Sequence, residues 1–147
     1  MGHALLIVDI QNDYFPGAPM ELEGAQAAAL QAAALLSHFR DAGRPVIHVQ
    51  HVSNRPGATF FLPDTPGAGI HPSVRPRAGE TIVIKHFPNS FRDTPLADLL
   101  RSRDIGELTV AGMMTHMCID ATVRAAFDLG LRCTLAHDAC ATRSLLF

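Results

Sequence analysis

The chain has 147 residues, of which 48% are hydrophobic and 18% charged, and its formal net charge is -2 at pH 7. This length suits a single domain, residues 1–147, with a substantial hydrophobic core. The small net charge gives no broad electrostatic reason to bind nucleic acid or an anionic membrane, and no apolar run approaches the roughly 20 residues that span a bilayer. We therefore expect a cytoplasmic protein with neither nucleic acid nor membrane as a partner.

The N-terminal third begins with a strand and continues into a helix. Residues 4–8 form a continuous apolar run that ends at Asp9, which is typical of a parallel strand buried on both faces. A helix is expected over residues 24–42, closed by Gly43. Its predicted apolar face, besides many alanines, consists of Leu30, Leu35, Leu36 and Phe39.

The middle of the chain repeats this alternation. A second strand is expected over residues 45–52. Residues 53–79 are rich in proline and glycine, which indicates a long surface loop, and loops of that length are usually functional or disordered. A third strand over residues 81–84 ends at Lys85, and a helix over residues 94–102 follows it.

The last third carries one more strand, helix and strand. Residues 108–111 form a fourth strand running into Gly112, residues 118–129 a helix, and residues 132–136 a fifth strand. Strands that alternate with helices predict a three-layer α/β/α domain, in which right-handed crossovers cover both faces of a central parallel sheet. The apolar tail at residues 144–147 has no helix after it. We expect that the natural polypeptide is longer, with its C-terminal part missing here, or that a homo-oligomer covers this surface.

Three reactive side chains follow three different strands: Asp9, Lys85 and Cys118. Ligands of open parallel sheets bind outside the carboxyl ends of the strands, so these residues can converge although they are far apart in sequence. A lysine ammonium and a helix N-terminus both favour a thiolate, which predicts a lowered pKa for Cys118. Asp9 could accept the thiol proton and return it to a leaving amine. Cys133 and Cys140 have no such neighbours, and an odd number of cysteines argues against a disulfide framework.

Four strings of residues give the chain a recognisable pattern. They are DIQNDYF at residues 9–15, KHFPNSF at 85–91, GMMTHMCI at 112–119 and DACAT at 138–142. In this order and spacing the chain resembles the isochorismatase-like cysteine hydrolases, which include nicotinamidases, N-carbamoyl amidases and ureidoacrylate-type amidohydrolases. The resemblance implies a Rossmann-like fold and covers nearly the whole chain.

The resemblance also implies roles for individual residues. Asp9 would be the general base, Lys85 would stabilise the thiolate and the transition state, and Cys118 would be the nucleophile. A cis peptide would join Met113 to Met114, and the backbone N–H groups of Met114 and Cys118 would form an oxyanion hole. No cofactor is implied by this pattern.

The metal-binding motif of nicotinamidases is incomplete in this chain. Those enzymes carry Asp-x-His and a further histidine after the second strand, whereas this chain has His48 and His51 and lacks the aspartate. Alternation with valines favours packing or hydrogen bonding for both histidines. We therefore predict no bound zinc or iron.

Residues that contact the substrate are harder to identify than the catalytic ones. Phe15, Phe87 and Phe91 follow the catalytic strand ends and are candidates for the walls of an apolar pocket, although aromatic residues at such places are often core. His116 precedes the nucleophilic turn and is a candidate for substrate contact or for a helix cap. Gln11 and Asn12 are expected to fix the loop that holds Asp9.

The function predicted from these features is hydrolysis of an amide or carbamoyl-type C–N bond in a small molecule, through a thioester on Cys118. Alternatives are a catalytically silent binding protein on the same fold, and an ether hydrolase of the isochorismatase type. A thiol redox protein is disfavoured because no resolving cysteine lies near Cys118 in sequence. A flavodoxin-like nucleotide binder is disfavoured because neither GxGxxG nor a P-loop follows any strand.

Overall fold

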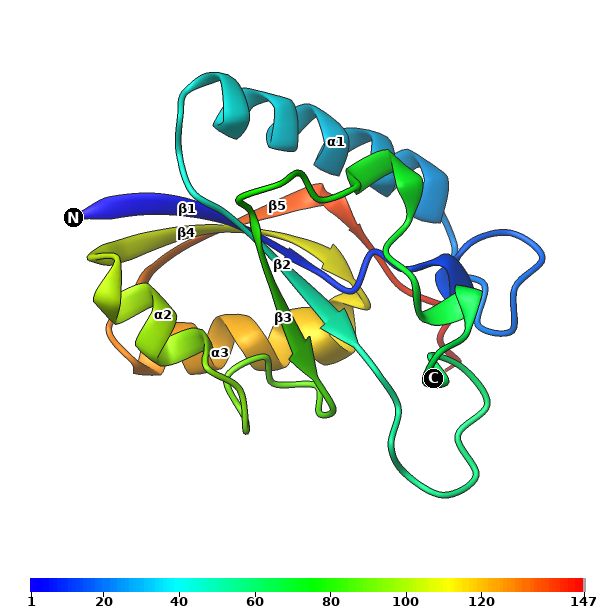
Figure 1. The fold of residues 1–147 in the computed structure, drawn as a ribbon. Helices are drawn as coiled ribbons and strands as arrows, with labels where there is room; N and C mark the ends of the chain where they lie inside the picture. The colour runs from blue at the N-terminus through cyan, green and yellow to red at the C-terminus, as the bar shows by residue number, and fades with distance from the viewer. Residues whose placement is uncertain (147) are drawn as a thin grey trace.

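The computed structural model describes residues 1–146 as a five-stranded sheet with helices on both faces (Figure 1). The strands are β1 (Gly2–Val8), β2 (Val46–His51), β3 (Thr81–Lys85), β4 (Ile105–Met113) and β5 (Arg132–Ala141). Their order is β3-β2-β1-β4-β5, and every neighbouring pair is parallel. The predicted three-layer α/β fold is therefore confirmed.

The helices divide between the two faces of the sheet. α1 (Ala25–Asp41) covers one face, and α2 (Leu96–Ser102) and α3 (Asp120–Asp128) cover the other (Figure 1). The chain moves from β1 to β2 and β3 on one side, then returns across β1 to place β4 and β5 on the other. The strand order therefore reverses between β1 and β4, which is where open α/β sheets bind their ligands.

Two apolar clusters hold the three layers together. The cluster beneath α1 includes Leu5, Ile7, Leu36 and Phe39, and the cluster beneath α2 and α3 includes Leu6, Val8, Leu96 and Leu100. Consecutive β1 residues alternate between the clusters because side chains of a strand point to opposite faces in turn. This double burial explains why residues 4–8 read as an uninterrupted apolar run.

The predicted buried face of α1 was wrong in one position. Leu30 is 68% exposed, whereas alanines and Leu36 and Phe39 make the buried face. The buried alanines are Ala25, Ala28, Ala29 and Ala32. Their small side chains bring the helix backbone close to the sheet, so Leu30 lies on the solvent side.

The C-terminal elements differ from their predicted limits. β4 and β5 are longer than predicted, and α3 begins at Asp120, after a π-helical turn over Thr115–Ile119 that contains Cys118. The expectation for the apolar tail concerns residues 144–147, of which Phe147 lies outside the described residues. Among residues 1–146, no helix is long and apolar enough to cross a membrane.

Candidate active site

Four of the five strands, β1 to β4, each bring one polar side chain to the same edge of the sheet. Asp9 directly follows β1, His51 ends β2, Lys85 ends β3, and Cys118 lies in the turn after β4. His51 and Lys85 are register partners in the parallel β2–β3 pair, so their side chains lie side by side on one face. The parallel topology therefore gathers residues that are separated by up to 109 positions in the sequence.

Lys85 lies at the centre of this group. Its Nζ is 2.8 Å from Asp9 Oδ2, 2.8 Å from His51 Nδ1 and 3.2 Å from Cys118 Sγ. Asp9 and Lys85 are fully buried, and Cys118 is 5% exposed. The structure thus brings together the three residues that the sequence predicts as catalytic, and adds His51 to them.

Burial dominates the protonation of the carboxyl and thiol groups. It raises the pKa of Asp9 above its ordinary value, because a carboxylate loses its hydration there, and the Lys85 ammonium only partly opposes this. A carboxylate with a raised pKa is a stronger base than an exposed aspartate. Oδ1 of Asp9 has no hydrogen-bond partner among the described residues, so it is available to a proton or a ligand.

The pKa of Cys118 is shifted in the direction opposite to the prediction. Burial raises it, the negative charge of Asp9 raises it further, and Lys85 lowers it without cancelling the two. The prediction considered the effects of the lysine and the helix N-terminus on the pKa, but the depth at which the sulfur is buried is not visible in the sequence. The resting group is therefore a thiol, and a base must remove its proton before or during attack.

Gln11 anchors His51 at the end of β2. Its side-chain Nε2 donates to the His51 carbonyl oxygen, and its Oε1 accepts from the His51 backbone N–H, both at 2.8 Å. Gln11 Nε2 also donates to Ala68, and Asn12 Nδ2 donates to the carbonyl of Pro66. The prediction that Gln11 and Asn12 fix a loop rather than meet a ligand agrees with these contacts.

The end of β4 has the backbone geometry that the resemblance implied. The peptide bond between Met113 and Met114 is cis. Met114 and Cys118 both line the same cavity. Their roles as oxyanion-hole donors stay a prediction.

This cavity has a volume of about 320 Å³ and opens beside the sulfur of Cys118. Its aromatic walls come from Tyr14, Phe60, Phe61 and Phe87, and its polar lining includes Ser53, Asn54, Arg55 and His86. The predicted long loop over residues 53–79 supplies five of the lining residues, namely Ser53, Asn54, Arg55, Phe60 and Phe61. It is therefore a wall of the site rather than a distant surface loop.

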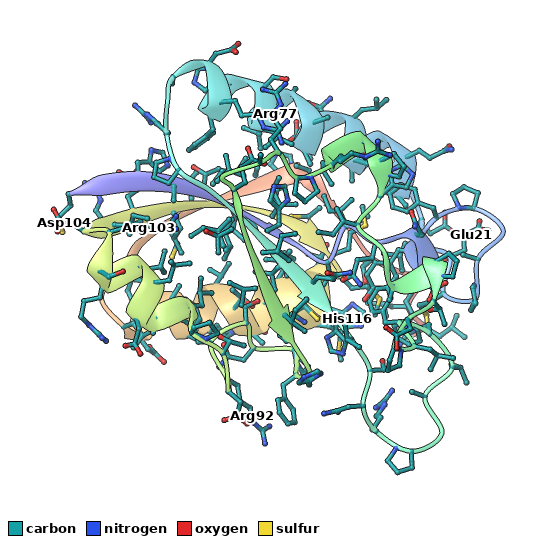
Figure 2. All side chains as sticks on the ribbon, viewed as in Figure 1. Glu21, Arg77, Arg92, Arg103, Asp104 and His116 are labelled. Atoms are coloured by element: carbon teal, nitrogen blue, oxygen red, sulfur yellow. The ribbon has the colours of Figure 1, made fainter. Side chains whose placement is uncertain are left out.

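Of the four predicted substrate contacts, only Phe87 lines the cavity, and the Arg92 guanidinium lies 3.6 Å from the centre of its ring. Phe15 is buried in the core and stacks on His71 with 3.7 Å between ring centres. Phe91 packs against the cluster beneath α2 and α3. His116 Nδ1 is hydrogen-bonded to the Thr142 hydroxyl; Figure 2 labels it near the carboxyl ends of the strands.

Tyr14 and Phe61 are two of the wall residues that sequence reasoning passed over. Tyr14 follows Asp9 by five positions, and burial together with the charges of Asp9 and Cys118 raises the pKa of its phenol. Phe61 is 1% exposed, and its backbone N–H donates to Asp13 Oδ2 at 2.8 Å. The DIQNDYF string places Tyr14 close to the candidate base Asp9, and this proximity was a usable signal for Tyr14. No sequence signal connects Asp13 with Phe61.

One group of side chains in the described part of the chain could hold a metal ion. Ligand atoms of Asp9, His51 and Cys118 lie within 4.8 Å of one another. The Lys85 ammonium lies within 3.2 Å of an atom of each of the three, so a cation of the chain itself already contacts all of these ligand atoms. His48 is not part of this group, because it hydrogen-bonds Glu80 on the opposite face. The predicted absence of zinc or iron stays a prediction.

A larger groove of about 590 Å³ lies between α3 and β5, and it is less suited to catalysis. Its lining includes Ile119, Val123, Phe127 and Leu135. The ionisable Asp120 and Arg124 of this groove pair with each other at 2.9 Å on an exposed surface. The groove lacks a buried group of reactive side chains, so the cavity beside Cys118 is the better candidate site.

Comparison with known proteins gives the same picture of the chain. A family model described as the Isochorismatase domain matches residues 3–146. An uncharacterized isochorismatase family protein of Bacillus subtilis is 54% identical over 145 residues, covering 99% of this chain and 81% of that protein. A streptothricin hydrolase of Streptomyces noursei is 40% identical over 139 residues, but the chain spans only 49% of its length.

Among solved structures, an isochorismatase-type protein from Oleispira antarctica superposes with a TM-score of 0.95 at 54% sequence identity. The match covers 99% of this chain and 79% of the Oleispira chain. The similarity to isochorismatase-type proteins, in sequence and in structure, therefore extends over almost the whole chain. The chain belongs to the isochorismatase family of hydrolases.

Proposed function

We propose that this hydrolase cleaves an amide or carbamoyl-type C–N bond of a small molecule, with Cys118 as the nucleophile. The observation that carries the proposal is the contact of one buried ammonium, Lys85, with both Asp9 and Cys118 at the wall of a cavity. A nucleophile, a base and a cation within hydrogen-bonding reach are what acyl transfer requires. A maleamate amidohydrolase of Pseudomonas putida, 32% identical over 149 residues, is among the relatives and supports amide chemistry.

The first half of the proposed reaction forms a thioester. Asp9 takes the thiol proton while Cys118 Sγ attacks the carbonyl carbon, and the carbonyl oxygen becomes an oxyanion. Lys85 stabilises the developing thiolate, and the N–H groups of Met114 and Cys118 would receive the oxyanion. When the tetrahedral intermediate collapses, the C–N bond breaks and the leaving nitrogen takes the proton from Asp9.

The second half releases the acid. Asp9, again a carboxylate, removes a proton from water, and the resulting hydroxide attacks the thioester carbonyl. The C–S bond then breaks, and the sulfur regains its proton from Asp9. The raised pKa of Asp9 suits this work, because the same group must accept and return a proton near neutral pH.

The cavity restricts the substrates that this chemistry could reach. A volume of about 320 Å³ suits a small molecule, and four aromatic side chains favour a planar or apolar group next to the carbonyl. No carboxylate is among the residues lining the cavity within the described part of the chain, whereas Arg55 is. The lining therefore favours neutral or anionic amides over cationic ones.

The test is ammonia release from a panel of small primary amides and carbamoyl compounds. We expect turnover by the wild type, loss of about 10³-fold or more in Cys118→Ala, and a covalent acyl-enzyme detected by mass spectrometry. Cys133→Ala is the matched control, because Cys133 lies away from the cavity and should leave turnover unchanged. Undiminished turnover in Cys118→Ala would refute the nucleophile, and activity on vinyl ethers alone would favour the ether hydrolase instead.

A further inference from the structure

The ammonium of Lys85 has as many partners as protons. A lysine ammonium carries three N–H donors and no acceptor. Its three contacts are Asp9 Oδ2, His51 Nδ1 and Cys118 Sγ, at 2.8, 2.8 and 3.2 Å. Two of these partners take part in the proposed proton transfer and change charge during the reaction. The third partner is His51, which neither gains nor loses a proton in the proposed reaction.

The position of His51 is fixed from several sides. It ends β2 in register with Lys85, and Gln11 holds both its backbone N–H and its carbonyl oxygen. The ring of Phe61 lies 5.8 Å from the imidazole, centre to centre. The strand end that carries the imidazole is therefore held in place, with the Phe61 ring beside it.

The imidazole is neutral in this environment. Burial lowers the pKa of His51 to about 3, and the positive charges of Lys85, His86 and Arg55 lower it in the same direction. Those three residues, with Asp9 and Cys118 beyond the ammonium, are the ionisable groups that face the ring. A neutral imidazole that accepts from a lysine must carry its proton on Nε2, which leaves the Nδ1 lone pair for the Lys85 ammonium.

We propose that His51 is a positioning residue, whose Nδ1 accepts a hydrogen bond from one N–H of the Lys85 ammonium and thereby directs the other two N–H groups at Asp9 and Cys118. The inference rests on the proposed function, which it deepens. Without this acceptor the ammonium would lose one of its three fixed directions and could shift towards Asp9 alone. Because Asp9 and Cys118 compete for the same cation, such a shift would remove the stabilisation of the thiolate.

The test compares three variants. His51→Leu removes the acceptor, and His51→Asn restores one, because the asparagine Oδ1 stands where Nδ1 stands in histidine. His48→Leu is the matched control: it also replaces a buried histidine of β2, but one that contacts Glu80 on the other face of the sheet. We expect His51→Leu to lower kcat by about 10- to 100-fold with little change in KM, and the other two to stay near wild type.

A second measurement does not need a substrate. Alkylation of Cys118 by iodoacetamide, followed by peptide mass spectrometry over a series of pH values, reports how well Lys85 stabilises the thiolate. We expect the pH profile to move to higher pH in His51→Leu and to coincide with wild type in His51→Asn. Should the wild type hydrolyse no amide, the proposed function fails, and this profile alone decides the role of His51.

Two results would overturn the proposal. One is a His51→Leu enzyme with the kcat and alkylation profile of the wild type. The other is an equal loss of kcat in His48→Leu and His51→Leu, which would assign the effect to strand stability rather than to the ammonium.

Discussion

Asp9 and Cys118 both have raised pKa values, and for each group the largest cause is the desolvation that accompanies burial. In the proposed reaction, the proton of the sulfur would therefore pass to a base that is stronger than an ordinary aspartate. Lys85 contacts both groups and makes a negative charge on either of them tolerable. In the proposed mechanism, this arrangement would let Cys118 act as the nucleophile without a histidine as its base.

The acid limb of the pH–rate profile tests this view of Asp9. The base must be ionised, so kcat/KM should be retained at pH values above the pKa of Asp9 and fall as the pH drops through it. Because burial raises that pKa, the limb should lie above the range of an exposed aspartate. The limb belongs to the coupled group rather than to one residue, so an Asp9→Asn variant, inactive across the range, is the control. A limb at or below the ordinary aspartate range would contradict the role of burial.

The metal content of the purified protein tests whether the Lys85 ammonium, rather than a metal ion, is the cation bound by Asp9, His51 and Cys118. Elemental analysis should find far less than one zinc or iron per chain, and dialysis against a chelator should leave turnover unchanged. One tightly held equivalent per chain, lost together with activity, would show that a metal displaces the Lys85 ammonium.

At the level of elements, β4 approaches β1 most closely at Gly112. Its φ is 140°, and a Cβ there would overlap the carbonyl oxygen of Val8. Asp9 directly follows Val8, and the Met113–Met114 peptide directly follows Gly112. The same close approach therefore sets the position of the base and of the proposed oxyanion hole.

Gly112→Ala should destabilise the fold by about 3 kcal/mol or more, because the backbone of β1 cannot move aside. Gly130 is the matched control, with a φ of 87° and open space of at least 4 Å around the position that a Cβ would take. Gly130→Ala should cost only about 1–2 kcal/mol, which is the strain of the left-handed conformation. Urea unfolding gives both values, and equal losses would contradict the importance of the β1–β4 approach.

Glu80 ties α1 to the β2–β3 edge of the sheet. Its carboxylate accepts two bonds from Arg40 at 2.7 Å, one from the Arg77 backbone N–H at 2.9 Å, and contacts His48 Nε2 at 3.0 Å. Burial alone would raise its pKa, but these bonds outweigh it and lower the pKa to about 2. The carboxylate is therefore more stable in the folded chain than in the unfolded one.

Glu80→Gln should lower the free energy of unfolding by about 1–3 kcal/mol at neutral pH. Because the folded pKa is depressed, the advantage of the wild type should persist above the ordinary glutamate pKa and shrink as the pH falls towards about 2. Urea midpoints measured over that range check both statements. Glu107→Gln is the control, since Glu107 has no ion pair among the described residues. A difference that is constant with pH would contradict the electrostatic origin.

At the scale of the whole molecule, the surface formed by α3, the residue after it and β5 exposes large apolar side chains. Phe127, Leu129 and Leu135 are 72%, 56% and 42% exposed, and two of them line the groove between α3 and β5. The homo-oligomer expected from the sequence stays a prediction, and sedimentation velocity on the purified chain tests it. A monomer at all concentrations would contradict it.

Much of this molecule could be predicted from local sequence. Apolar runs of five residues such as 4–8 identify strands buried on both faces, and polar residues that end those runs must meet at one sheet edge because all the strands are parallel. That reasoning located Asp9 and Lys85 at strand ends and Cys118 just beyond another, and the family resemblance then implied their roles. Sequence reasoning failed for Leu30, because helical periodicity alone does not say which of two apolar stripes faces the sheet.

What the sequence by itself determined was therefore the alternation of elements, the parallel sheet and the three reactive residues at its edge. Only the tertiary structure decided the depth of burial, the β2–β3 register that sets His51 against Lys85, and the folding of residues 53–79 over the sulfur. The physical reason is that strand formation and alternation depend on neighbours in sequence. Desolvation and charge pairing depend instead on groups brought together from distant positions, and those forces set the protonation of the site.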